Sequence, residues 1–354
     1  MTSAAILGPL ASAPSRGALR ARRSTRGRAP RRAVSVRASS KEDEDLLGDL
    51  IANNAASFDG KLRTLVVGVS DFQGDEMLNH RNSTTSTLFK HRRWLDGYKV
   101  PGQFVTITDT DSGKSVRKPI SVSPYRARTT APNSDVSVVE LLLDTMSDDG
   151  DENFFAAAQP PMRLRVSPVA GAGFENPLFS EFNLSSAIER GDAIVAFAGG
   201  ARGMGPLRAV MEWPNVASHA DKHPVTLFYL NCGDKPAPVD PDNPDAVEQA
   251  NGRGAAFVEQ WDEWREGGAA VVPCFGPFFD DGVFAVQSAM VGGVAEWGGK
   301  HGTVLGKDAR RVTVLLAGLE KEEVSAILRV PALRAVPKEQ ILALPGFVSR
   351  NSRT

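Results

Sequence analysis

The second half of the chain alternates apolar strands with amphipathic helices, and this rhythm limits the folds open to it. Stretches of strand length are expected at 193–200, 225–231, 269–276 and 311–319. Helical patterns follow them at 206–213, 255–264, 284–297 and 320–330, and a short strand is expected at 340–344. Such alternation is typical of a parallel sheet covered by helices on both faces. We therefore predict a doubly wound α/β domain over residues 186–354, with a Pro- and Asp-rich insertion at 234–254.

The first half consists of short strands broken by turns. We expect strands at 61–72, 104–114, 117–125, 136–146 and 162–169. The sequence DTDSGK at 109–114 predicts a hairpin turn. Closely spaced strands without a long helix between them indicate an antiparallel Greek-key β-barrel over residues 60–185. Residues 41–59 are acidic and then helix-like, and are expected to be a flexible lead-in.

Residues 1–40 contain nine arginines and no acidic residue. This composition is typical of an organelle transit peptide, and the alternative, a basic nucleic-acid-binding arm, lacks lysine. The sequence VSVRASS resembles a plastid processing site, so we expect a chloroplast protein, in the stroma or peripheral to the thylakoid. Without these arginines, 32 basic residues face 42 acidic ones, a net charge of −10 that disfavours nucleic-acid binding. No apolar run approaches the roughly 20 residues that span a bilayer.

Residue types that bind metals or act as nucleophiles are few. Cys232 and Cys274 have neither a disulfide framework nor metal-ligand spacing, and we predict that both are buried. The five histidines form no ligand cluster, so a metal enzyme is not supported. The chain has no G-x-S-x-G elbow and no Walker A lysine, which disfavours a serine hydrolase and a P-loop enzyme. Trp261, Trp264 and Trp297 are expected in the core or an interface.

The sequence AGGARGMGPLR at 198–208 lies between a predicted strand and a predicted helix. A glycine-rich turn in that position holds the phosphates of a dinucleotide in many α/β domains, because free N–H groups and the helix dipole face the anion. A bare strand-to-helix turn is the alternative. A ligand is expected at the carboxyl ends of the strands.

Four motifs then appear in a recognisable order: PGQFVTI at 101–107, KPISVS at 118–123, GARGMGPLR at 200–208 and LLAGLEKEEV at 315–324. Their order and spacing resemble the ferredoxin–NADP reductase-like superfamily, and most closely its plastid branch of FAD/NAD(P)-binding oxidoreductases. The resemblance covers residues 62–347. It implies a barrel of the FAD-binding FR type, an α/β domain that binds NADP or NAD, and hydride transfer between the two cofactors.

The resemblance also assigns flavin contacts. The first segment comprises Lys118, Pro119, Ile120, Ser121 and Val122. Lys118 replaces the family's phosphate-binding arginine, Ile120 replaces its aromatic residue, and Ser121, near the redox ring, is the catalytic candidate. A second segment comprises Gly150 and Asn153, and the acidic run at 148–152 beside them opposes tight FAD binding by repelling phosphate. Gly173 and Phe174 are expected close to the flavin or the domain interface.

The nicotinamide contacts implied by the resemblance are Gly200, Arg202, Gly203, Met204, Pro206, Leu207, Asn231 and Gly318. Pro206 suits the first turn of a helix. Arg202 either reaches a pyrophosphate or blocks the nicotinamide pocket. Lys235 would favour NADP and Asp234 would favour NAD, and Ala317 stands where the family often has cysteine.

Two hypotheses follow. The first is a chloroplast FAD-dependent NAD(P)H oxidoreductase with an unidentified electron acceptor, either a small molecule or a protein. The second is a non-catalytic relative that kept the fold and acts as a binding or assembly partner in the plastid, with other plastid α/β enzymes as a remainder.

Overall fold

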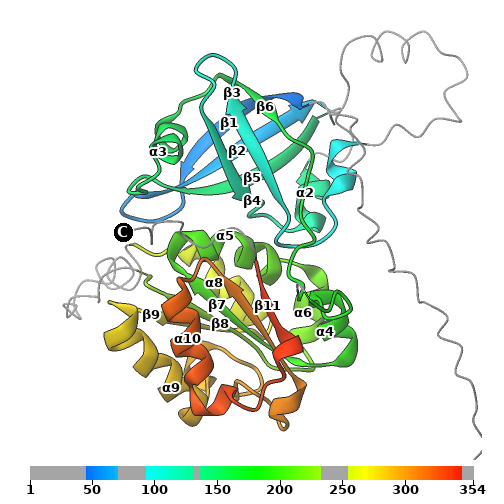
Figure 1. The fold of residues 1–354 in the computed structure, drawn as a ribbon, viewed down its shortest axis with the longest axis vertical. Coiled ribbons are helices and arrows are strands. Elements are labelled where there is room, and N and C mark those ends of the chain that lie inside the picture. The colour runs from blue at the N-terminus through cyan, green and yellow to red at the C-terminus, as the bar shows by residue number, and fades with distance from the viewer. Residues whose placement is uncertain (1–44, 71–92, 131–135, 177, 233–253, 345–354) are drawn as a thin grey trace, which may run out of the picture. The chain divides into compact units, whose positions relative to one another are not determined.

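Figure 1 shows the fold in a computed structural model of the chain. The structure describes residues 45–70, 93–130, 136–176, 178–232 and 254–344. Residues 43–354 form one compact unit. The expected transit peptide, nearly all of the predicted insertion, and the two residues expected to choose between NADP and NAD lie outside the described residues.

Antiparallel strands build the first domain. They are β1 (Leu46–Ala55), β2 (Leu62–Ser70), β3 (Phe104–Asp109), β4 (Ser115–Pro119), β5 (Val136–Asp144) and β6 (Met162–Val166). Their order is β4-β3-β6-β1-β2-β5, and a bridge between Ile120 and Leu141 brings the end of β4 back to β5. Strand β6 thus returns beside β3 after the run β3, β4, β5, which is a Greek key. The predicted antiparallel barrel is confirmed, and it is nearly closed.

Alternating strand residues fill the barrel core. In β3, Val105 and Ile107 are fully buried, whereas their neighbours Thr106 and Thr108 are only partly covered. Burying a Val or Ile side chain contributes about 1.5–3 kcal/mol, so this alternation fixes which face of the strand turns inward.

The expected lead-in is in fact the first strand of the barrel. Strand β1 pairs with β2 on one side and with β6 on the other. Leu50 lies in the barrel core, and a Cβ added to Gly48 would lie 2.7 Å from the carbonyl oxygen of Gly68. The lead-in prediction is wrong for these residues because the strand pairing shifts register between Leu50 and Ala52, which breaks the period-2 pattern in the sequence.

Short helices cover the barrel. They are η1 (Trp94–Gly97), α2 (Pro124–Thr130) and α3 (Gly150–Ala157). Helix α3 follows β5 and buries Phe155 in the barrel core. Figure 1 shows α3 and α2 on opposite sides of the barrel.

Parallel strands build the second domain. They are β7 (Ala193–Gly199), β8 (Val225–Leu230), β9 (Ala270–Cys274), β10 (Val312–Ala317) and β11 (Ile341–Ala343), in the order β11-β10-β7-β8-β9. Every residue of β7, β8 and β10 is buried, as parallel strands covered on both faces require.

Helices cover both faces of this sheet. One face packs against α4 (Leu184–Arg190), α5 (Gly200–Met211), α6 (Pro214–Ala220) and α8 (Val258–Glu266). The other face packs against α9 (Val283–Gly292) and α10 (Lys321–Arg329). The described part of this domain also contains short helical turns: η2 (Phe278–Gly282), η3 (Ala295–Trp297), η4 (Ala309–Arg311), η5 (Pro331–Leu333) and η6 (Lys338–Gln340). The doubly wound prediction is confirmed.

Several side-chain predictions are confirmed as well. Cys232 and Cys274 are buried, Trp261 and Trp264 lie in the core on the α8 face, and Trp297 is half-buried against the opposite core. Within the described ranges, no helix has the length and apolar character that crossing a membrane requires.

The hairpin turn between β3 and β4 generates a pH-dependent prediction. The hydroxyl and the N–H of Ser112 donate to Oδ2 of Asp109, at 2.5 and 2.8 Å, and these bonds lower the pKa of the Asp109 carboxyl. We expect Asp109→Asn to lose about 2 kcal/mol of unfolding free energy at neutral pH. Because the folded pKa is depressed, the advantage of the wild type is present above about pH 4 and disappears as the pH falls through the folded pKa.

Urea unfolding at several pH values measures this difference. Asp111→Asn is the matched control, since Asp111 is an exposed carboxylate of the same turn. A gap between Asp109→Asn and the wild type that stays constant at every pH would contradict the prediction.

Candidate functional site

The order of the parallel strands reverses between β7 and β10. The chain moves from β7 to β8 and β9 on one side, and then crosses to β10 and β11 on the other. In an open α/β sheet this reversal leaves a crevice at the carboxyl ends of the two central strands, where ligands bind. Here those ends are Gly199 and Ala317.

Two predicted site residues, Gly203 and Gly318, meet at this switch point. A Cβ on Gly203 would lie 2.2 Å from the carbonyl oxygen of Ala317, and one on Gly318 would lie 2.2 Å from the backbone nitrogen of Gly203. Gly318 also has a φ of +68°, which favours glycine. The two glycines therefore allow the first turn of α5 to lie directly against the end of β10.

The predicted glycine loop is the beginning of α5. The helix starts at Gly200, and its N-cap, Gly199, makes no side-chain capping bond. Its first turn contains no acidic residue, and Arg202 is half-buried there. Backbone N–H groups at such an uncapped end, together with the helix dipole, favour an anion.

Pro206 lies inside α5, so the prediction that it opens the helix is wrong. Its ring leaves the carbonyl of Arg202 without the usual helical hydrogen bond. Met204 and Leu207 are fully buried in the core between α5 and the sheet, so their side chains pack inside the domain.

Asn231 lies just beyond β8 and has a left-handed backbone, with a φ of 52°. Its Nδ2 donates to Oε1 of Glu323 at 3.1 Å, and Oε2 of Glu323 accepts the N–H of Glu320 at the start of α10. The Asn231 amide therefore ties the end of β8 to the N-terminus of α10.

The barrel segment expected to touch a flavin is turned inward. Lys118 is opposite Val105 in the β3–β4 pairing, and directly opposed residues of antiparallel strands share a face. Val105, Ile120 and Val122 all belong to the barrel core. Lys118 and Ile120 therefore face the interior, and Pro119 between them faces the opposite side.

Lys118 is paired with Glu152 of α3. Its Nζ lies 2.5 Å from Oε1 of Glu152, and the two side chains are only 12% and 5% exposed. The neighbouring Asn153 donates through Nδ2 to the carbonyl of Ser147 at 2.7 Å, and its Oδ1 is buried with no partner among the described residues.

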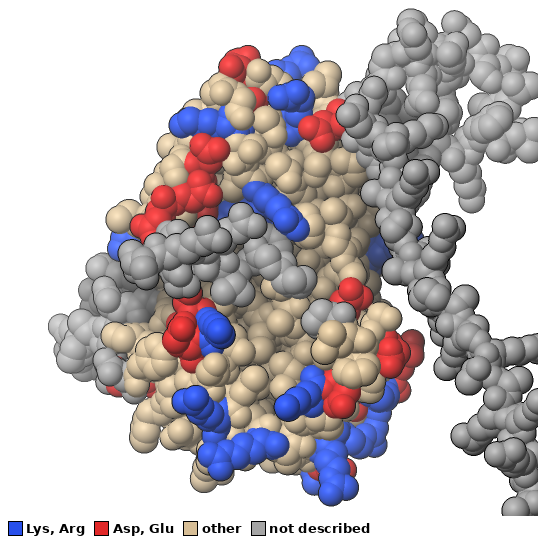
Figure 2. Space-filling view, viewed as in Figure 1, with Lys and Arg blue, Asp and Glu red and all other residues tan. Residues whose placement is uncertain are grey.

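The N-terminus of α3 is capped by the chain itself. The Asp149 side chain accepts the backbone N–H groups of Asp151 and Glu152, at 2.9 and 3.4 Å. Gly150 is the first residue of the helix, and a Cβ there would meet no atom within 4 Å. Figure 2 shows acidic side chains gathered over this side of the barrel.

Ser121, the catalytic candidate, is fully buried. Its Oγ has no hydrogen-bond partner in the part of the chain that the structure describes. A Cβ on Gly205 of α5 would lie 3.6 Å from the Cβ of Ser121. The side chain of Ser121 is therefore closed to solvent, and α5 packs beside it.

Gly173 and Phe174 lie where the chain leaves the barrel. Gly173 has a φ of +79°, and a Cβ there would lie 2.5 Å from the carbonyl oxygen of Pro101. Phe174 is buried in the core on the α5 face of the sheet, and its carbonyl accepts the N–H of Leu184 at the start of α4. Both residues thus pack at the connection between the domains.

The predicted residues therefore form two groups rather than one cleft. Lys118 and the N-terminus of α3 meet on the barrel, and Gly203 and Gly318 meet at the switch point of the sheet. Ser121 belongs to neither group, because α5 covers it.

Sequence patterns alone do not reveal a buried ion-pair network that joins the domains. Arg208 of α5 is 3% exposed and binds Glu140 of β5 at 2.6 Å and Glu212 at 2.8 Å. Arg126 of α2 also reaches Glu212, at 2.9 Å. Burial opposes the charge of Arg208, but the two carboxylates outweigh burial and hold its pKa above the ordinary value. The Arg-x-x-x-Glu spacing at 208 and 212 is the available sequence signal, although nothing in it points to β5.

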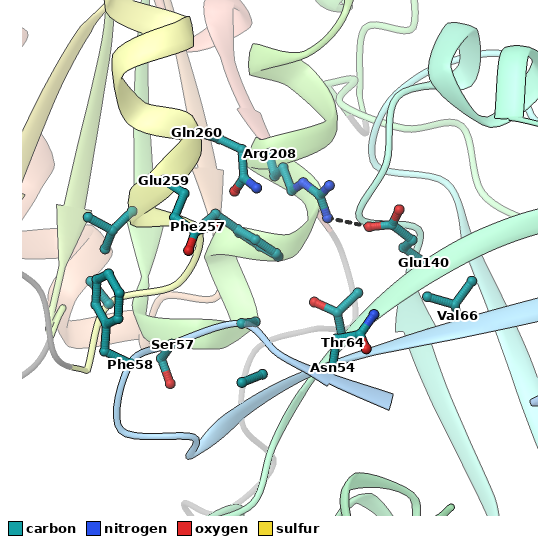
Figure 3. A pocket seen from close by; sticks show the side chains of 14 residues that line it. Asn54, Ser57, Phe58, Thr64, Val66, Glu140, Arg208, Phe257, Glu259 and Gln260 are labelled. Atoms are coloured by element: carbon teal, nitrogen blue, oxygen red, sulfur yellow. Dashed lines mark hydrogen bonds and ion pairs between the residues drawn. The ribbon is translucent and has the colours of Figure 1, made fainter. Parts of the chain in front are cut away.

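A cavity of about 380 Å³ lies between the domains beside this ion pair (Figure 3). Arg208 and Glu140 lie on one side of it. Phe257 of the α/β domain also lines the cavity, and its backbone N–H donates to the carbonyl of Ala56, just after β1 of the barrel, at 2.9 Å. The lining also includes Asn54, Ala55, Ser57, Phe58, Thr64, Val66, Ala255, Val258, Glu259 and Gln260. None of the predicted site residues lines this cavity.

Buried titratable groups elsewhere offer no nucleophile. Burial raises the pKa of the Cys274 thiol to about 12 and that of Cys232 well above its ordinary value, so both thiols stay protonated. Burial likewise raises the pKa of Tyr98, whose hydroxyl donates to the carbonyl of Val122 at 2.6 Å. Among the described residues, no group of three or more His, Cys, Asp or Glu side chains could hold a metal.

Comparison with known proteins identifies the fold. No protein-family model and no curated protein sequence matches the chain. A cytochrome P450 reductase from Amycolatopsis is 14% identical, with a TM-score of 0.51 over 86% of this chain and 70% of that one. A flavohemoglobin from Malassezia yamatoensis with bound FAD and heme is 10% identical, with a TM-score of 0.51 over 85% and 59% of the two chains.

A ferredoxin NADP+ reductase from Neisseria gonorrhoeae with bound FAD and NADP gives a TM-score of 0.47 at 12% identity, over 81% of this chain and 92% of that one. Identities this low show likeness of fold alone. The chain shares the two-domain fold of the Amycolatopsis reductase and the Malassezia flavohemoglobin, here a nearly closed antiparallel barrel followed by a parallel sheet.

The residues that the family resemblance assigns to FAD do not fit it as they lie. The Lys118 ammonium is bound by Glu152, the first N–H groups of α3 are bound by Asp149, and Ser121 is sealed under α5. The N-terminus of α5, in contrast, has no carboxylate in its first turn and fits an anionic ligand.

The Arg208 network generates a stability prediction. Removing one partner of a buried ion pair leaves the other charge uncompensated and costs about 3–5 kcal/mol. We expect Arg208→Met to lose that much unfolding free energy. Arg126→Met is the matched control, because Arg126 binds the same Glu212 but its side chain is 45% exposed, and it should lose less than about 1 kcal/mol. Urea unfolding measures the unfolding free energy of both variants. Equal losses would contradict the prediction that the buried arginine contributes more than the exposed one.

Proposed function

We propose that the chain is an oxidoreductase that takes hydride from NADPH or NADH and passes electrons, through FAD, to an acceptor that is either a small molecule or a protein. The observation that carries the proposal is the switch point between β7 and β10, where an uncapped glycine-rich helix begins in a chain of reductase-like fold. The neighbouring flavohemoglobin contains FAD, and the other neighbour in that comparison is a cytochrome P450 reductase.

The nucleotide half of the proposal depends on α5. Its first N–H groups and the Arg202 guanidinium would hold the pyrophosphate, and Gly203 and Gly318 bring that helix end against β10. The resemblance does not choose between NADP and NAD. Hydride transfer is the chemistry of the cofactors, so the chain's own task is to bind and orient them.

A second candidate function is favoured by the barrel. The Lys118–Glu152 pair, the capped N-terminus of α3 and the covered Ser121 all support a non-catalytic relative that kept the fold and acts as a binding or assembly partner.

Purification of the full-length protein tests the two functions. Under the oxidoreductase proposal, the protein shows a visible flavin band or takes up added FAD, and it oxidises NADPH or NADH with an artificial electron acceptor. A colourless protein that takes up no FAD and binds neither nucleotide would refute the oxidoreductase proposal and support the non-catalytic one.

Arg202 gives a sharper readout of the nucleotide site. A charge-assisted hydrogen bond contributes about 1.5–3 kcal/mol, so Arg202→Ala should weaken nucleotide binding about tenfold or more in calorimetry. Arg329→Ala is the control, since Arg329 is an exposed arginine in the last turn of α10, away from the carboxyl ends of the strands. Tighter binding by Arg202→Ala would instead show that Arg202 blocks the pocket.

We propose a chloroplast location, in the stroma or peripheral to the thylakoid, because residues 1–40 are rich in arginine and lack acidic residues. Fused to a fluorescent protein, these residues should direct it into chloroplasts. A version with the nine arginines changed to glutamine should remain in the cytosol, and import of both versions, or of neither, would count against the proposal.

A further inference from the structure

The buried carboxylate of Glu152 is held by the kinds of donor that hold a phosphate. The Lys118 ammonium lies 2.5 Å from its Oε1, which also accepts the backbone N–H of Asp144 at 2.9 Å. The hydroxyl of Ser147 donates to Oε2 at 3.0 Å. An ammonium, a backbone N–H and a hydroxyl together form an anion site, and the anion bound in it is the carboxylate of Glu152.

The helix beside this pair is closed to anions as well. Asp149 accepts the N–H groups of Asp151 and Glu152, so the donors that would face a ligand phosphate are used inside the chain. Asp151 accepts the N–H of Ser115 at 3.1 Å, which ties the same helix end to β4. A phosphate brought here would meet three carboxylates within the first turn and its cap, and like charges repel.

Burial makes this arrangement durable. The Glu152 side chain is 5% exposed and the Lys118 side chain 12% exposed, so salt and water screen their attraction weakly. An exposed pair would open at little cost, but separating this largely buried pair leaves each charge without its oppositely charged partner.

We propose that Glu152 is an internal competitor of the phosphates of FAD: its carboxylate holds Lys118 and closes the barrel's anion site, so that FAD reaches Lys118 only when Glu152 is displaced. This inference deepens the proposed function and rests on it. The competitor acts on phosphate alone, so a flavin without phosphate is indifferent to Glu152.

The test compares FAD with riboflavin. Flavin fluorescence titrations on full-length wild type and Glu152→Gln should show at least about tenfold tighter FAD binding by the variant and unchanged riboflavin binding. Glutamine keeps the shape and can still accept the N–H of Asp144, so the fold is expected to survive. The charge-matched control is Glu189→Gln on the exposed side of α4, which should bind both flavins as the wild type does.

Two further variants show that the gain comes through the proposed contacts. Asp149→Asn keeps a capping side chain but removes a charge, and it should also tighten FAD binding. Adding Lys118→Met to Glu152→Gln should return FAD affinity to the wild-type value, because the freed ammonium is then gone. Circular dichroism and the unfolding midpoint confirm folding of each variant.

The inference is overturned if the wild type binds FAD as tightly as Glu152→Gln, if no variant gains affinity, or if riboflavin gains as much as FAD. Failure of the proposed function gives a different result from failure of this inference. In that case Glu152→Gln takes up FAD more tightly than the wild type, yet the loaded protein does not oxidise NADPH or NADH.

Discussion

The two domains meet along α5, and glycine residues allow that helix to approach both the sheet and the barrel closely. At Gly203 the helix touches the end of β10, and at Gly205 it faces Ser121 and Leu142 of the barrel, 3.6 and 3.4 Å from where a Cβ would stand. One turn after Gly205, Arg208 reaches Glu140 of β5. Because residues three apart share a helix face, the glycine contact and the ion pair join the same side of α5 to the same strand. Helix α5 is therefore held against β5 at two successive points along one side of the helix.

The two domains differ in the charged side chains that lie at the N-terminus of one helix in each, α5 and α3. Helix α5 begins with glycines, has no acidic residue in its first turn and carries Arg202. Helix α3 begins with a capping Asp149 and has two more carboxylates in its first turn. The backbone gives both helix N-termini a partial positive charge, so the two ends differ only in the side chains that neutralise this charge. No side chain caps the start of α5 and no carboxylate lies in its first turn, whereas the start of α3 is capped by Asp149 of the same chain.

Sequence periodicity was sufficient to predict the architecture, because buried parallel strands and alternating barrel strands leave strong patterns in the sequence. It failed to predict elements whose bounds depend on contacts with residues distant in the sequence. The register shift after Leu50 hid β1, and close packing of Gly203 against β10 extended α5 back to Gly200, beyond the point that Pro206 suggested. The sequence indicated that the acidic run at 148–152 would repel phosphate, but it did not indicate that Lys118 pairs with Glu152 of this run. That Lys118 faces inward toward Glu152 follows from strand register, which a one-residue slip would invert. The contact of Arg208 with Glu140 joins residues 68 positions apart, and no local pattern encodes it.

The position of the space between the domains follows from the same helix face. Glu140 and Leu142 lie on the outer side of β5, since Val139, Leu141 and Leu143 fill the barrel core. Where α5 offers Gly205, it comes close enough to cover Leu142 and Ser121, and no room is left. Where it carries Arg208, the side chain reaches Glu140, and the cavity of about 380 Å³ lies beside this pair, lined by residues of β1 and β2. A volume of this size lies within the range of small-molecule sites. The interdomain space of this chain therefore borders the β1–β2 hairpin and the start of α8, and no residue of the β4 segment lines it.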